Sequence, residues 1–234
     1  MLSKSTAAAT LLMLCAACSV PWSQEHPRTE VNLAFNLESN LIYLPSTLLD
    51  GHEGRFMLAT AAPATVVDPA FPLKHARRSV LTIGEKESLR FTPRRVPLNG
   101  VADAMIGADV WGKNALTIDY HSGLVTYQKE GIHPESMSLF QFTAEPMVLV
   151  SVDGVLLTAI VDTSSPDTLV IPSPREGRGT AKVSIAANDF GSIDVAYANV
   201  HHARIGNRLL SRFLVTIDYG KHVVGLWRDP RVAI

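Results

Sequence analysis

Residues 116–120, LTIDY, have a near-copy 99 positions further along the chain, VTIDY at residues 215–219. An Ile-Gly pair precedes each of them, at residues 106–107 and 205–206. Two unrelated β-rich stretches would not be expected to share both features in the same order. A repeat of about 100 residues indicates two copies of one small domain in tandem.

A second pair of blocks extends the repeat toward the N-terminus. Residues 58–67, LATAAPATVV, align with residues 161–170, VDTSSPDTLV, at a separation of 103 positions. LDG at residues 49–51 aligns with VDG at residues 152–154 at the same separation. The different separations of the two blocks fit a loop that differs in length between the copies.

Both copies have the composition of β structure. Short runs rich in β-branched and aromatic residues are separated by Gly, Pro, Asn and Asp, and long helical periodicity is missing. Clear examples occupy residues 147–152, 155–161, 214–219 and 223–227. We therefore expect an all-β fold.

The composition is that of a folded globular protein of 234 residues, with 47% hydrophobic and 18% charged residues. Lys and Arg number 21 against 22 Asp and Glu, so we expect no nucleic-acid partner. The two cysteines, Cys15 and Cys18, lie near the N-terminus and leave the rest of the chain without thiols. His201 and His202 are adjacent, so their side chains would point to opposite faces of a strand. We expect neither a metal nor another cofactor.

Residues 1–30 have the pattern of an export signal peptide followed by a polar tether. The apolar run at residues 7–17 is shorter than the ~20 residues that span a bilayer. LCAAC at residues 14–18 resembles a bacterial lipobox, although Cys15 stands where that motif prefers Leu. Two outcomes stay open, lipidation of Cys18 or ordinary signal cleavage nearby. Both predict an exported, periplasmic protein, and the first predicts membrane attachment through the lipid.

Residues 159–165, AIVDTSS, and residues 203–210, ARIGNRLL, are similar to the motifs of one lobe of the aspartic peptidases. The resemblance is to the retropepsin-like kind found in bacterial envelope proteins, duplicated in one chain as in the pepsin-like enzymes. It covers roughly residues 40–230. It implies a bilobal fold of two homologous β-barrel lobes, with a cleft between them that binds a peptide or protein. The implied parts are an N-terminal lobe (31–130), an interlobe connection (131–143) and a C-terminal lobe (144–234).

The resemblance also assigns roles to residues, with Asp162 matching the catalytic aspartate. The other matches are the active-site loop residues Thr163, Ser164, Ala59, Thr60 and Ala61, and the loop-supporting residues Ile106, Gly107, Ile205 and Gly206. In this family the threonines of the two motifs hydrogen-bond across the two-fold axis. The stretch between Arg78 and Arg94 corresponds to a flap hairpin that closes over the cleft. Arg204 stands where the family usually has an apolar residue.

The first copy lacks its catalytic aspartate, because Ala59 stands where the family has Asp. Hydrolysis by this route needs two carboxylates across a water, one acting as a base and the other as an acid. We therefore expect a protein that binds peptide with hydrolysis impaired or lost. Replacing Ala59 by Asp is expected to raise activity at acid pH.

An active aspartic endopeptidase that uses Asp162 remains the alternative. Two chains could pair so that Asp162 meets its own copy, as in single-lobe retropepsins, although the internal repeat already offers the second lobe a partner. Another acid could also fill the gap, and Asp68 and Asp167 are the nearest in sequence. The sequence leaves the oligomeric state open.

Overall fold

The structure, a computed structural model, describes residues 30–74, 77–84, 87–112, 114–129, 131 and 137–228. The expected signal peptide and Cys18 lie outside these residues. Strands dominate the described chain, and its helices are the single turns α1 (Ala108–Trp111) and α2 (Asn207–Leu210). The expectation of an all-β fold is confirmed.

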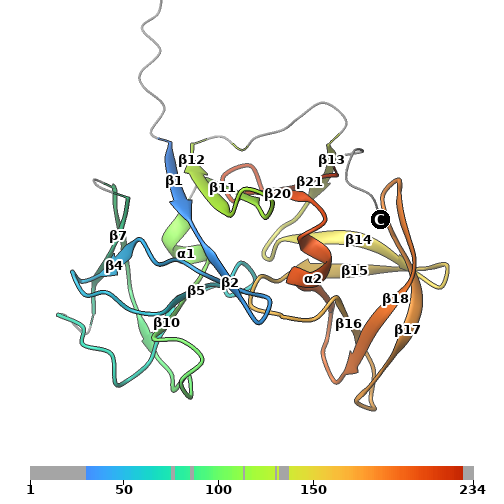
Figure 1. Cartoon of the computed structure of the whole chain (residues 1–234), viewed down its shortest axis with the longest axis horizontal. Helices are drawn as coiled ribbons and strands as arrows, with labels where there is room; N and C mark the ends of the chain where they lie inside the picture. The colour runs from blue at the N-terminus through green and yellow to red at the C-terminus, as the bar shows by residue number, and fades with distance from the viewer. Residues whose placement is uncertain are drawn as a thin grey trace, which may run out of the picture.

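A sheet shared by both halves of the chain lies across the top of the view in Figure 1. Its strand order is β1 (Val31–Ala34), β12 (Leu124–Gln128), β11 (Ala115–Asp119), β20 (Leu214–Asp218), β21 (Val223–Trp227) and β13 (Ser138–Gln141). The two LTIDY-like segments form β11 and β20, which pair antiparallel at the centre. Thr117 lies opposite Thr216, and their hydroxyl oxygens are 3.0 Å apart. The repeated motif therefore joins the two halves.

The second half forms a closed barrel, the yellow to orange strands of Figure 1. The strand order is β14 (Met147–Val152), β15 (Val155–Val161), β19 (Ala203–Ile205), β16 (Leu169–Pro172), β18 (Asn188–Ala198) and β17 (Gly177–Ile185). The burial pattern along β14, and along β17 from Ala181 onward, points one side chain in two into the barrel. This half matches the barrel expected from the resemblance.

In the first half the equivalent strands are divided between two sheets, unlike the expected second barrel. One sheet has the order β2 (Asn36–Glu38), β3 (Leu41–Tyr43), β5 (Phe56–Leu58), β10 (Ala104–Ile106), β6 (Val66–Val67) and β9 (Arg94–Arg95), and the other has β4 (Thr47–Leu49), β7 (Ser79–Ile83) and β8 (Glu87–Phe91). Pro45 lies between β3 and β4, which together correspond to β14. Pro93 lies between β8 and β9, which correspond to β18. Proline cannot donate a ladder hydrogen bond, which accounts for both interruptions.

The repeat also includes a strand that the sequence comparison does not reveal. β1 pairs with β12 on one side of the shared sheet, and β13 pairs with β21 on the other. Leu33 lies opposite Val125, as Phe140 lies opposite Val224, at equivalent places of the two copies. Part of the expected interlobe connection, residues 131–143, thus belongs to the shared sheet.

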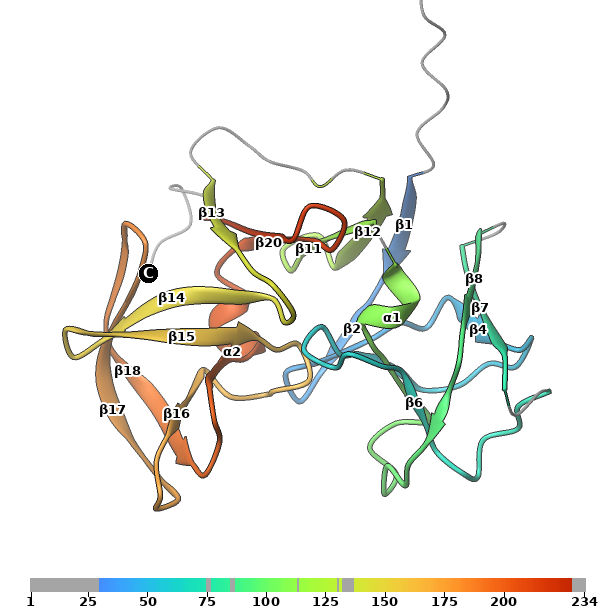
Figure 2. The same cartoon turned by 180° about the vertical axis from the view of Figure 1, so that it is seen from behind.

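The hairpin β7–β8, expected as a flap, packs within the first half instead. β7 pairs with β4, and Ser79, Leu81 and Ile83 are buried along one face of it. The end of the hairpin lies close to β1, since a Cβ added to Gly84, the residue after β7, would lie 2.9 Å from Cγ1 of Val31. In Figure 2 the strands β4, β7 and β8 stand at the outer edge of the first half, away from the barrel. The apolar face of the hairpin explains this position, because burying it in the core stabilises the fold.

Candidate functional site

Two loops that follow β5 and β15 meet where the halves join, and the repeat gives them matching backbone bonds. The N–H of Ala59 donates to the carbonyl of Ile106, and the N–H of Asp162 donates to that of Ile205, each at 3.0 Å. The same turn follows, with Ala62 bonded to Ala59 and Ser165 bonded to Asp162, each at 3.1 Å. The structure therefore places Ala59 and Asp162 at equivalent positions of the two loops.

The two Ile-Gly pairs support these loops, because the backbone comes very close at each glycine. A Cβ on Gly107 would lie 2.7 Å from the carbonyl carbon of Ala64, and one on Gly206 would lie 2.2 Å from the carbonyl oxygen of Asp167. No side chain fits at such distances. Glycine is thus required at both places, and the isoleucine before each is fully buried.

Thr60 and Thr163 exchange hydrogen bonds across the junction, as the resemblance implied. The hydroxyl of Thr163 accepts from the N–H of Thr60 (3.1 Å) and donates to the carbonyl of Leu58 (2.8 Å). The hydroxyl of Thr60 accepts from the N–H of Thr163 (3.1 Å) and donates to the carbonyl of Val161 (2.7 Å). Both threonines are fully buried, so each hydroxyl satisfies two backbone groups that water does not reach.

Asn207 adds a second set of bonds between the halves, which the sequence did not predict. Its side-chain amide donates to the carbonyl of Asn40 in the first half (2.6 Å) and to that of Thr163 in its own half (2.7 Å). Its oxygen accepts from the hydroxyl of Tyr120, at 2.7 Å. Ala108 occupies the equivalent place in the first half, at the start of α1. That polar-for-apolar difference between the copies was the only sequence feature that could have revealed Asn207.

Tyr120 bonds from the first half to the second, and its counterpart Tyr219 bonds from the second half to the first. The hydroxyl of Tyr219 donates to the carbonyl of Thr60 (3.3 Å). Burial raises the pKa of both phenols well above the ordinary value of about 10. The folded protein therefore keeps protons that the unfolded chain loses above pH ~10, and its free energy of unfolding should fall as the pH rises further.

Tyr219→Phe should remove about 1.4 kcal/mol per pH unit of that alkaline slope, because one such proton is lost. Phe keeps the ring that packs edge-on against Phe142. Urea unfolding between pH 7 and pH 11 tests this. An unchanged slope above pH 10 would show that the phenol of Tyr219 does not stay protonated in the folded state.

The side chain of Asp162 is buried and fully engaged. Its Oδ1 accepts from the N–H (2.9 Å) and the hydroxyl (2.5 Å) of Ser164, and its Oδ2 accepts from Nη1 of Arg204 (3.0 Å). The ion pair follows from the topology, because the parallel pairing of β15 with β19 places Arg204 beside Ile160, two residues before Asp162. The sequence marked Arg204 as a departure from the family pattern but did not connect it with Asp162.

The opposite loop brings no second acid to Asp162. Ala59 is fully buried, and Ala61 beside it is also apolar. The carboxylate of Asp68 accepts from the N–H groups of Leu98 (2.7 Å) and Ala70 (2.9 Å), which hold the pKa of that carboxyl below its usual range.

Asp167 is also engaged elsewhere, in an ion pair of 3.1 Å with the exposed Arg178. The two acids considered for the gap, Asp68 and Asp167, thus have other partners. A carboxylate pair does not form among the residues that the structure describes at these loops.

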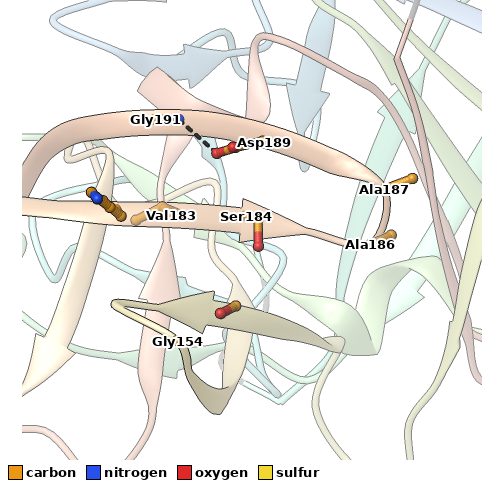
Figure 3. A pocket seen from close by; sticks show the side chains of 9 residues that line it. Gly154, Val183, Ser184, Ala186, Ala187, Asp189 and Gly191 are labelled. Carbon is orange, nitrogen blue, oxygen red and sulfur yellow. Dashed lines mark hydrogen bonds between the residues drawn. The ribbon is translucent and has the colours of Figure 1, made fainter.

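Three other features bear on the expectations. His201 and His202 are exposed, and in the described part of the chain no three side chains of the metal-binding kinds gather. A shallow hollow of about 520 Å³ lies between the β14–β15 turn and the β17–β18 hairpin, where Ser184 and Asp189 line it (Figure 3). None of the residues of the two loops lines it. Within the described residues, no helix has the length and apolar character needed to cross a membrane.

A scan against protein-family models finds no match for this chain, and a search of the curated proteins finds none either.

Proposed function

We propose that this protein is an aspartic-peptidase-like binding protein, which captures peptide between its two halves without hydrolysing it. The observation that carries the proposal is the ion pair between Asp162 and Arg204. In the peptidase mechanism a water lies between two carboxylates that share one proton. Here the methyl group of Ala59 occupies the position equivalent to one of these carboxylates. The guanidinium of Arg204 neutralises the other carboxylate, that of Asp162.

The interlocked loops support retention of the two-lobed binding architecture. The bonds of Thr60 and Thr163 keep the loops together although the pair of acids is missing. Those of Asn207 to Asn40 and Tyr120 add further contacts between the halves. A scaffold that keeps its interlobe contacts, but not its reacting groups, is what a binding function needs.

The alternative, an active endopeptidase formed by two chains, would have to separate these contacts. A second Asp162 could reach the first only if Thr60 left Thr163 and β11 left β20. Both sets of contacts are buried, and opening them would expose unpaired backbone groups.

Localisation belongs to the same proposal. The N-terminal segment would export the chain to the periplasm of a bacterial envelope, where lipid on Cys18 would hold it at the membrane. Mass spectrometry of the N-terminus extracted from membranes tests this. An unmodified mature N-terminus beyond Cys18 would contradict the lipid anchor.

Asp162→Asn separates binding from hydrolysis. We expect the purified mature wild-type protein to capture peptides from an unbiased mixture and leave them uncut, and we expect Asp162→Asn to capture them as well. Asp167→Asn, which changes an acid three residues from the second loop motif, is the matched control. Mass spectrometry of the bound and free fractions gives the result. A product that appears with the wild type and the control, but not with Asp162→Asn, would show peptidase activity.

A further inference from the structure

The ion pair at the site is asymmetric in its exposure to solvent. The Asp162 side chain is 2% exposed, whereas that of Arg204 is 43% exposed. The negative end therefore points into the protein and the positive end points outward. A family site with two carboxylates presents a negative charge to its ligand, but this one presents a cation.

Arg204 also lies in apolar surroundings, which strengthen its attraction for an anion. The residues beside it on the neighbouring strands are Ile160 and Val170, which are 5% and 8% exposed. A cation beside apolar side chains interacts more strongly with an anion than a fully solvated one does. The equivalent position in the first half, between Met57 and Val66, holds Met105. The charge is therefore a feature of the second half alone.

The hydrogen-bonding capacity of Arg204 is only partly used. Among the described residues, Asp162 is the only partner of the guanidinium, and it receives one bond, from Nη1. The Nε atom is buried and has no partner there. A guanidinium offers five N–H donors in a geometry that suits a carboxylate. Nε is out of reach of a ligand, so the donors that remain for one belong to the exposed part of the side chain.

We infer that Arg204 binds a carboxylate of the captured peptide, either its C-terminus or an acidic side chain. The inference rests on the proposed function, because it names the chemistry that the same site selects. Asp162 then acts as a positioning residue, since it holds the guanidinium in place and lowers the net charge that the ligand meets. Removing Arg204 should weaken binding of carboxylate ligands, and removing the charge of Asp162 should strengthen it.

The probes are random octapeptide pools without Asp or Glu, made once with a free C-terminus and once as the C-terminal amide. A second set, amidated throughout, carries Glu or Gln at one fixed position. We expect the wild type to bind one carboxylate form about ten- to a hundredfold more tightly than its neutral counterpart. The set in which this preference occurs identifies the C-terminus or the side chain as the source.

Arg204→Met should abolish this preference, and Asp162→Asn should increase it. Methionine is the residue that the first half has at this position. The double variant Asp162→Asn/Arg204→Met leaves no buried charge without its partner, and it should fold and bind acid and neutral forms equally. Arg208→Met removes an exposed arginine four residues away and should keep the preference.

The two ways of failing are distinct. Equal binding of acid and neutral pools by the wild type, or an equal preference in Arg204→Met, would overturn the role of Arg204 and leave peptide capture standing. If no pool bound at all, the proposed function would fail, and this inference with it.

Discussion

Ala59→Asp combined with Arg204→Met should create acid-range peptidase activity that neither change creates alone. We expect cleavage by the double variant at least about a hundredfold above that of either single variant, since members of a catalytic unit act together and each loss costs powers of ten. The measurement is the rate of product formation from an unbiased peptide mixture between pH 3 and pH 7.

The reason lies in the charge of the site. Two carboxylates that face each other across a water share one proton, because both cannot be ionised without strong repulsion. In Ala59→Asp alone, the guanidinium of Arg204 would offset that repulsion and stabilise both carboxylates in the ionised form. No proton would then be available for the carbonyl oxygen of the substrate or the leaving amine. The sequence alone predicts that Ala59→Asp suffices, and the ion pair adds Arg204 as a second requirement.

A triple variant with Asp162→Asn in addition is the control, and it should be inactive. Full activity of Ala59→Asp by itself would show that Arg204 does not block the reaction. A folded but inactive double variant would show that the two loops do not place the carboxylates across a water. Circular dichroism and thermal unfolding establish that each variant is folded.

The parts of this site that could be predicted are those that the repeat preserves. The family resemblance implied the threonine exchange, because Thr60 and Thr163 match its two motifs, and it implied the loop supports at the two Ile-Gly pairs. Local sequence is enough there, because the same motif residues occur in both copies.

The unpredicted parts depend on pairing between distant segments. Arg204 reaches Asp162, 42 residues away, only because β15 and β19 are parallel neighbours. β13 has little in its sequence in common with β1, and its place is set by pairing with β21. The division of the first half into two sheets could be predicted only in part. Pro45 and Pro93 are evident in the sequence, but the strands that they interrupt are not.

Thr163→Val should lower the free energy of unfolding by about 2 to 6 kcal/mol, the largest loss of stability that we predict for a substitution preserving side-chain volume. Valine has nearly the shape of threonine but cannot bond to the N–H of Thr60 or the carbonyl of Leu58. Both groups would then be buried without a partner, at about 1 to 3 kcal/mol each. Urea unfolding measures the change.

Thr158→Val, on an exposed position of β15, is the matched control and should change stability by no more than about 0.5 kcal/mol. Thr60→Val should cost about as much as Thr163→Val, since it leaves the N–H of Thr163 and the carbonyl of Val161 unpaired. The double variant should cost less than the sum of the two. Once one substitution has loosened the junction and admitted water, the groups exposed by the second are solvated. Strict additivity would mean that the two loops are stabilised independently, and a loss near zero for each would mean that the halves do not meet at these threonines.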